Sequence, residues 1–322
     1  PVLLIGPPGI GKTQIMEQIA RECEIGLVAY TITHHTRQSA VGLPFIKEEQ
    51  YDGKTYSVTE YTMSEIIASV YRKIEEGGRK EGILFIDEIN CVSETLAPTM
   101  LQFLQCKTFG NQAVPEGWII AAAGNPPEYN KSVREFDLVT LDRVRRIDIE
   151  PKLSVWQDYA RAHRLHPAVT AYLELRPQHF YKIENDVDGV QFVTARGWED
   201  LSAYLQAADR LTLPVDEGVI GQYLRHPEVA RDFAAYWVLY RKYHEDYGVE
   251  DILQGKPYDA VIARAMDASF DERISLVSLL LAGLNTRFAD ARATGAVTDA
   301  CYQQLRSFKR TLSQQPDADP AD

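Results

Sequence analysis

The feature that most constrains this chain is a glycine-rich stretch near its start, which reads Gly6-Pro7-Pro8-Gly9-Ile10-Gly11-Lys12-Thr13. It fits the pattern G-x-x-x-x-G-K-[ST], follows the apolar run 2–5 and precedes a segment, 14–23, whose apolar residues recur at helical spacing. A strand, a glycine-rich loop and a helix in this order are the context in which the pattern forms a phosphate-binding loop. The glycines let backbone N–H groups point inward, and the helix N-terminus adds positive potential. The stretch is therefore predicted to hold a polyphosphate.

The side chains that end the stretch carry the predicted nucleotide chemistry. Lys12 is expected to place its charge on the β- and γ-phosphates, and the Thr13 hydroxyl is expected to bind Mg²⁺. Gln14, the next residue, belongs with residues 6–13 to the predicted nucleotide-binding set. The predicted cofactors are ATP and Mg²⁺. GTP stays open as an alternative, because such a loop recognises phosphates and not the base.

Length and composition describe an ordinary globular chain of 322 residues, enough for about two domains. The net charge of −12 argues against broad attraction to nucleic acid or to an anionic membrane surface. The four cysteines are scattered without a C-x-x-C pair, which predicts buried thiols in a reducing, cytoplasmic compartment. The longest nearly apolar run, 274–284, is too short to cross a bilayer. Since the numbering begins at Pro1, inside the first predicted strand, we expect a segment to precede it.

Strand-like and helix-like segments alternate through the first half of the chain. Apolar runs at 27–33, 83–86, 118–123 and 144–149 predict further strands, with helical patterns between them. Ser93 is expected to cap the N-terminus of one of these helices, which runs to about Gln105. This alternation predicts an α/β fold, a parallel sheet sandwiched by helices, within residues 1–150. Between 42 and 61, Asp52-Gly53 separates two strand-like runs, which predicts an inserted β-hairpin.

Beyond Pro151 helical patterns dominate. We expect an all-helical domain at 151–213, a helical extension at 214–312 and a disordered tail at 313–322, which is rich in Pro and Asp.

Polar side chains follow two of the predicted strands. Asp87 and Glu88 come directly after the run 83–86, and Asn125 follows the run 118–123. Ligands of parallel α/β sheets bind at the carboxyl ends of the strands, so these residues are expected near the phosphate-binding loop. Asp87 is predicted to hold Mg²⁺ with Thr13, directly or through water, and Glu88 to activate the attacking water. Asn125 is predicted either to orient that water or to touch the γ-phosphate.

Five segments in this order and spacing resemble the AAA+ ATPases, and most of all their MoxR branch. They are GPPGIGKT, ILFIDEIN, AAAGNPP, LDRVRRIDIE and VTARGWEDL, and they span residues 1 to about 213. Asn90 and the inserted hairpin favour the MoxR-like proteins within the larger class. The resemblance implies an AAA+ large domain followed by a helical lid.

The resemblance also implies roles for three residues. Asn125 matches the sensor 1 position, Arg143 matches an arginine finger that reaches the γ-phosphate of the neighbouring subunit, and Arg196 matches sensor 2 on the lid. The sequence departs from the family pattern at Val144, where Phe is common, and at Ala195, where Pro is common. The second departure leaves open where the sensor helix starts.

Other arginines leave alternatives open. Arg145 and Arg146 adjoin Arg143, so one of them could share the finger's role, or the three could form a solvated basic edge. Arg134 is a further candidate for a contact between subunits.

The function implied is that of an ATP hydrolase that forms a homo-oligomeric, hexameric ring and remodels, assembles or activates a client protein, as a chaperone does. The hairpin is the expected client-facing element, and a partner with a von Willebrand factor A domain is expected beside it. One alternative is a DNA-processing motor, although the predicted hairpin carries more acidic than basic residues. The other is a nucleotide-gated scaffold with negligible turnover, which Glu88 and Arg143 disfavour.

Overall fold

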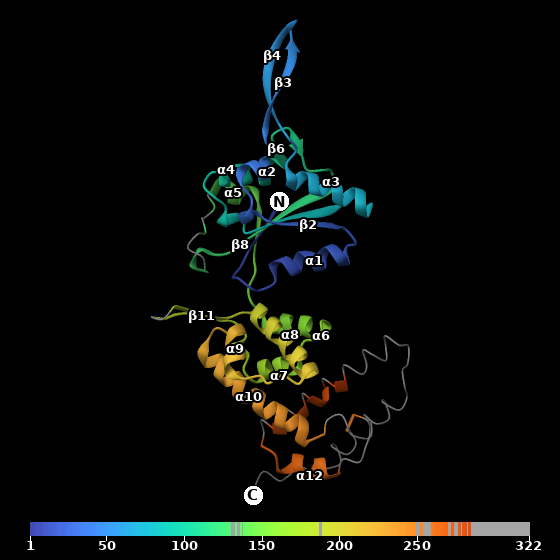
Figure 1. Ribbon diagram of the computed structural model, residues 1–322, viewed down its shortest axis with the longest axis vertical. Coiled ribbons are helices and arrows are strands. Elements are labelled where there is room, and N and C mark those ends of the chain that lie inside the picture. The colour runs from blue at the N-terminus through green and yellow to red at the C-terminus, as the bar shows by residue number, and fades with distance from the viewer. Residues whose placement is uncertain are drawn as a thin grey trace. The chain divides into compact units, whose positions relative to one another are not determined.

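The computed structural model describes residues 1–129, 133, 136, 138–186, 189–248, 252–253, 259–269, 272–273, 276–277, 279–281 and 283–284. The predicted tail 313–322, the last part of the predicted extension and Arg134 lie outside these residues. The chain divides into two compact units, Pro1–Lys152 and Leu153–Asp322, and each is described by itself (Figure 1).

The first unit is built on a five-stranded parallel sheet with the strand order β2-β5-β8-β1-β9. Its strands are β1 (Val2–Ile5), β2 (Gly26–Thr31), β5 (Gly82–Asp87), β8 (Trp118–Gly124) and β9 (Arg145–Asp148). Its helices are α1 (Lys12–Glu22), α2 (Arg37–Val41), α3 (Glu65–Gly77), α4 (Ala97–Cys106) and α5 (Leu138–Arg143). The predicted α/β fold with a parallel sheet is confirmed.

The sheet is buried on both faces because its central strands are apolar throughout. In β5, Leu84 and Ile86 pack in one hydrophobic cluster, whereas Ile83 and Phe85 pack in another on the opposite face. The first cluster includes the apolar side of α3, and the second includes Met16 of α1. Successive side chains of a strand point to opposite faces, so a continuous apolar run is the pattern that a strand covered on both sides requires.

Trp118 closes the amino-terminal end of this sheet. Its side chain is 2% exposed. A Cβ atom added to Gly26 would lie 2.8 Å from the Trp118 ring, and one added to Gly82 would lie 2.6 Å from it. The indole therefore fits only because glycine stands at this end of both β5, the neighbouring strand, and β2, the strand beyond it.

The predicted hairpin forms from β3 (Pro44–Tyr51) and β4 (Lys54–Tyr61). The strands pair in one register from Pro44↔Tyr61 to Tyr51↔Lys54. Asp52 and Gly53 make the turn, with φ of 51° and 75°, which is the conformation that Asp-Gly favours in a two-residue loop. The hairpin projects away from the sheet and helices of its unit (Figure 1).

Three local expectations differ from the structure. A second, small hairpin of β6 (Thr108–Phe109) and β7 (Gln112–Ala113) was not predicted, because its strands are too short for a periodic pattern. Ser93 does not cap α4, which begins at Ala97; the Ser93 carbonyl instead accepts the N–H groups of Leu96 and Ala97 in a turn. Of the four thiols expected to be buried, Cys23 and Cys106 are exposed and Cys91 is half-buried, whereas Cys301 lies outside the described residues.

The second unit is mainly helical. Its helices are α6 (Leu153–Ala162), α7 (Pro167–Leu175), α8 (Ala195–Leu211), α9 (Glu217–Tyr223), α10 (Pro227–Asp246) and α12 (Asp259–Asp267). The expectation of an all-helical segment at 151–213 is wrong in one place, because β10 (Lys182–Asp186) and β11 (Gly189–Val193) form an antiparallel hairpin. The alternation of Val190 and Phe192 with polar residues is the signal for this strand.

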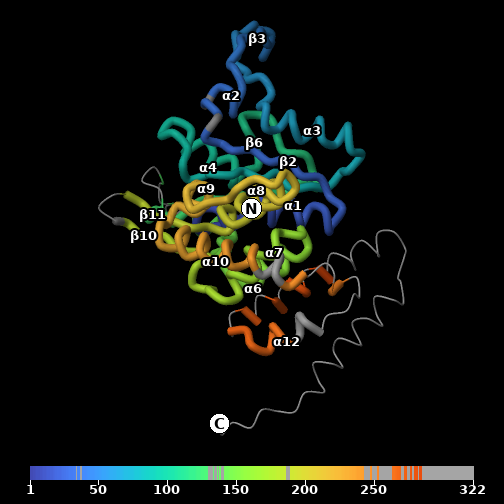
Figure 2. Tube along the Cα trace, turned by 60° about the horizontal axis from the view of Figure 1, so that its bottom comes forward, coloured from blue at the N-terminus to red at the C-terminus, as the bar shows by residue number. Residues whose placement is uncertain are grey.

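Aromatic side chains fill the core of this unit. Tyr172 of α7, Trp198 of α8 and Phe233 of α10 are each at most 1% exposed and lie within 5.6 Å of one another, measured between ring centroids. The same helices lie side by side in Figure 2. Phe233, Trp237 and Tyr240 of α10 are buried, as expected for aromatic residues that pack at helical spacing.

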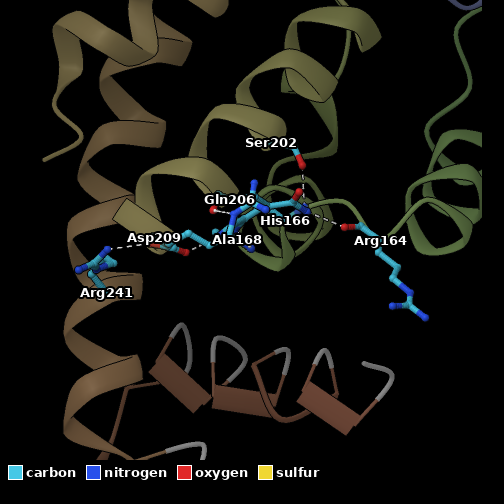
Figure 3. Close-up of polar contacts among 8 residues, drawn as sticks. Arg164, His166, Ala168, Ser202, Gln206, Asp209 and Arg241 are labelled. Carbon is cyan, nitrogen blue, oxygen red and sulfur yellow. Dashed lines mark hydrogen bonds and ion pairs between the residues drawn. The ribbon is translucent and has the colours of Figure 1, made fainter. Parts of the chain in front are cut away.

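A polar cluster joins α7, α8 and α10 (Figure 3). His166 caps α7, since its Nδ1 accepts the N–H of Ala168 at 3.1 Å. The ring proton therefore lies on Nε2, which donates to Asp209 of α8 at 2.9 Å, and Asp209 also pairs with Arg241 of α10 at 2.9 Å. A cavity of about 610 Å³ beside them is lined by His166, Pro167, Gln206, Asp209, Arg210, Tyr240 and Arg241. These mutual contacts hold the three helices together.

Among the described residues, none of the helices has both the length and the apolar character that a bilayer-spanning helix requires.

Candidate nucleotide-binding site

The predicted phosphate-binding loop connects β1 to α1. Gly9 and Gly11 have φ of 71° and 86°, in the left-handed region that favours glycine. A Cβ atom on Gly6 would lie 2.5 Å from the Ile149 carbonyl oxygen, so the loop starts in a place where only glycine fits. Lys12 is the first residue of α1, which leaves the first N–H groups of that helix directed at the loop.

Lys12 is buried, with 9% of its surface exposed. Its ammonium donates to the carbonyl oxygens of Gly6 at 2.8 Å and Pro7 at 2.9 Å, and to Oδ1 of Asn125 at 2.8 Å. A buried charge is tolerated only when it is hydrogen-bonded, and these three acceptors meet that need. The structure thus brings together Lys12 and Asn125, which lie 113 positions apart in the sequence.

Asp87 connects the loop to the end of β5. Its Oδ2 accepts the Thr13 hydroxyl at 3.1 Å, and its Oδ1 accepts the backbone N–H of Glu88 at 2.9 Å. The second bond helps Glu88 to adopt its left-handed backbone conformation, with φ of 58°. This turn lets two consecutive carboxylates leave the strand end in different directions.

Glu88 contacts a residue that the sequence did not single out. Its Oε2 accepts the Thr33 hydroxyl at 2.8 Å. The order of the strands would have predicted this contact, because β2 lies beside β5 with Thr31 opposite Asp87. Thr33 follows two residues later, so it reaches the same carboxyl edge of the sheet.

Asn90 is the second functional residue that the sequence reasoning did not assign to the site. It is 5% exposed in a short 3-10 turn, Ile89–Cys91, and its side chain bonds to the backbone of Asn125. The next residue, Cys91, has its thiol pKa raised, first by burial and then by the carboxylates of Glu88 and Asp87. The thiol therefore stays protonated and adds no charge beside them.

The predicted finger lies in the last turn of α5. Arg143 is exposed and donates to the side chain of Gln105 on α4. Nearby on β9, Arg146 pairs with Asp148 at 2.8 Å. Arg145 is exposed. Arg143 thus stands on the surface of its unit, which a residue acting on another subunit requires, and its role stays a prediction.

Arg196 belongs to the second unit. It is the second residue of α8, and it is exposed. The helix begins at Ala195, with the Thr194 hydroxyl accepting the N–H of Gly197 at 3.2 Å. Alanine in place of the common proline is therefore compatible with a capped helix start. The assignment of Arg196 to sensor 2 stays a prediction.

The donor atoms fit Mg²⁺ bound together with a nucleotide. No group of three His, Cys, Asp or Glu residues that could hold a metal occurs in the described part of the chain. Mg²⁺ does not require one, because in phosphate-binding sites it takes one or two protein oxygens and completes its shell with phosphate oxygens and water. The Thr13 hydroxyl and the Asp87 carboxylate, in mutual contact, are the two protein oxygens in question.

Comparison with known proteins places the first unit in a family. Residues 2–142 match the profile of the "ATPase family associated with various cellular activities (AAA)". No curated protein matches the chain. Among 423 matching chains of solved structures is a "putative ATPase" from Cytophaga hutchinsonii, 17% identical, with a TM-score of 0.29. That alignment covers 46% of this chain and 41% of the other, so the chain spans less than half the length of that protein. Residues 2–142 therefore match the AAA ATPase family at the level of one domain.

Proposed function

We propose that this chain is a Mg²⁺-dependent ATPase of the MoxR-like branch that forms a hexameric ring and remodels, assembles or activates a client protein. One observation carries the enzymatic part. At the carboxyl ends of adjacent strands, Lys12 is hydrogen-bonded to Asn125, and Thr13, the next residue, is hydrogen-bonded to Asp87. These residues supply a cation, a hydroxyl, a carboxylate and an amide, which are the groups that phosphoryl transfer uses for charge neutralisation and positioning.

Each residue has a distinct task in the proposed reaction. Lys12 and the backbone N–H groups of residues 9–14 bind the phosphates. Thr13 and Asp87 would hold Mg²⁺, which when bound neutralises charge on the phosphates. Glu88 takes the proton from the attacking water, and Asn125 orients that water.

Completion of the site is proposed to need a neighbouring copy. Arg143 would stabilise the developing charge on the phosphate of the adjacent subunit, which is why we propose a closed ring. Arg196 on the helical segment 151–213 would contact the nucleotide of its own subunit. Turnover would then change the position of that segment and pass the motion to the client.

The client is proposed to contact the β3–β4 hairpin. Its exposed apolar side chains include Ile46, which is 76% exposed, and Tyr51, which is 53% exposed. Lys47 is paired with Glu49 at 3.0 Å and Glu60 at 3.3 Å, so its charge is neutralised on the hairpin. Exposed apolar groups on a hairpin of net negative charge suit a protein surface better than a nucleic acid. A protein with a von Willebrand factor A domain is proposed as a further partner.

Two substitutions test the enzymatic proposal together. Lys12→Ala should abolish ATP binding in calorimetry. Glu88→Gln should keep ATP affinity but lower kcat by roughly 10²- to 10⁴-fold, the usual contribution of a general base. Lys47→Ala on the hairpin is the matched control for removal of a lysine and should keep basal turnover. Unchanged affinity in the first variant, or near wild-type kcat in the second, would refute the proposal.

A further inference from the structure

Asn90 completes the hydrogen bonding of the strand that carries Asn125. The ladder between β5 and β8 ends at Ile86↔Ala122, although β8 continues to Gly124. Beyond that point the backbone of Asn125 bonds to a side chain. Asn90 Nδ2 donates to the Asn125 carbonyl oxygen at 2.7 Å, and Asn90 Oδ1 accepts the Asn125 N–H at 3.3 Å. One planar amide thus contacts both polar groups of the Asn125 backbone.

Asn90 is buried against the backbone of Gly124. It is 5% exposed, and a Cβ atom on Gly124 would lie 2.6 Å from its Oδ1. The glycine before Asn125 therefore leaves the space that the Asn90 amide occupies. Because the backbone of Asn125 is held at both polar groups, the direction in which its side chain leaves the strand is held as well. That side chain accepts the Lys12 ammonium at 2.8 Å.

We propose that Asn90 is a positioning residue for ATP turnover, which acts by fixing Asn125 between the Asp87-Glu88 turn and Lys12. The inference rests on the proposed function, in which Asn125 orients the attacking water. Asn90 lies two residues after Glu88, and it bonds to the backbone of Asn125. The proposed base and the proposed water-orienting residue are therefore held by the same short segment of chain. Asparagine is required at this place because it offers a donor and an acceptor on one short, rigid group.

Asn90→Asp is the sharpest test, because it keeps the shape and removes only the donor. A carboxylate at residue 90 would face the Asn125 carbonyl oxygen with no proton between the two acceptors. We expect kcat to fall about tenfold or more, which is the effect of roughly one lost hydrogen bond. The Kd for ATP should change less, since Lys12 keeps its contacts with Gly6 and Pro7.

A pH profile separates positioning from a structural role. Protonation of the new carboxyl restores an O–H donor, so the ratio of variant to wild-type kcat should rise as the pH falls. Asn90→Ser cannot be restored in this way and should show the loss without that rise. Asn111→Asp, at an exposed turn of the first unit, is the matched control and should leave kcat unchanged. Every variant is assayed well below its own midpoint of thermal unfolding.

A double-substitution cycle completes the test. If Asn90 acts through Asn125, then Asn90→Asp should cost little further activity in an Asn125→Ala background. Wild-type kcat in both Asn90 variants, or full additivity with Asn125→Ala, would overturn the inference. Glu88→Gln is measured in parallel: if it loses turnover while the Asn90 variants do not, only this inference fails. If Glu88→Gln also keeps turnover, the proposed function fails first.

Discussion

Glu88 is held by two contacts, one at its backbone and one at its side chain. Its backbone is bent by the bond to Asp87, which directs its side chain out of the line of β5. Its carboxylate then bonds to Thr33, at the end of β2. In the sheet, β2 lies on one side of β5, while β8 and β1, which lead to Asn125 and the phosphate-binding loop, lie on the other. The Thr33 contact therefore draws the carboxylate away from the loop.

Removal of that contact should raise basal turnover. Thr33→Val keeps the shape of the side chain and removes the hydroxyl, so Glu88 is free to turn toward the loop. We expect kcat to rise, by up to about tenfold for one hydrogen bond to a carboxylate, with little change in KM for ATP. Thr55→Val on the hairpin is the matched control. A fall in kcat of Thr33→Val would show that the hydroxyl instead orients Glu88 for catalysis.

The sequence predicted the residues of the site better than the residues that hold them in position. Lys12, Thr13 and Asp87 were predicted from a motif and from a strand end. Thr13 does contact Asp87, and Lys12 contacts Asn125, which was predicted from the end of the next strand. Thr33 and Asn90 were not assigned, because each acts through a neighbour across the sheet, and the strand order that brings them together is not a local property of the chain. Roles for Glu88, Asn125, Arg143 and Arg196 remain predictions.

At the scale of elements, the β3–β4 hairpin is separable from the sheet below it. Its base is closed by Leu43 and Thr62, since the Thr62 N–H donates to the Leu43 carbonyl at 2.9 Å and the Leu43 N–H donates to the Thr62 hydroxyl at 2.9 Å. These two residues already lie where the ends of a tight turn would lie. An excision between them should therefore leave the rest of the unit undisturbed.

Replacement of residues 44–61 by Asn-Gly should keep the ATPase and remove client contact. Basal kcat should stay within about twofold of wild type, because the hairpin supplies no residue of the candidate site. In a Glu88→Gln background with ATP, the proteins captured by the intact chain should be lost from the excised one. An unchanged set of captured proteins would reject the hairpin as the client-facing element.

Elements were predicted best where one pattern ran for a full turn or strand. The hairpin followed from Asp52-Gly53, and β5 followed from an unbroken apolar run. The start of α4 was misplaced because Ser93 makes a turn instead of a cap. Serine is common in both, since in each it accepts backbone N–H groups that would otherwise lack a partner. The β10–β11 hairpin was missed because the helices around it dominate the composition of that segment.

The proposed role of Arg143 decides whether one chain suffices for catalysis. Arg143 is exposed at the end of α5 and bonds to Gln105. A finger that acts on a neighbouring subunit makes activity a property of the assembly. Such a site can be divided between two defective chains.

Mixed assemblies test this division. Arg143→Ala subunits keep the phosphate-binding loop, and Lys12→Ala subunits keep the arginine. Mixing the two should restore part of the ATPase activity that each lacks alone. Lys12→Ala mixed with Glu88→Gln is the control and should stay inactive, because both losses lie in the same half of the site. Absence of rescue in the first mixture would count against a finger supplied by a neighbour.

The packing of Trp118 against Gly26 and Gly82 makes this residue useful for following the chain in solution. Of its four tryptophans, Trp118 alone belongs to the unit Pro1–Lys152, while Trp156, Trp198 and Trp237 belong to the other. With those three exchanged for phenylalanine, the emission of the remaining indole would report solvent entry at the foot of the sheet. The melting of the ATPase domain would then be visible optically, apart from that of the helices after it.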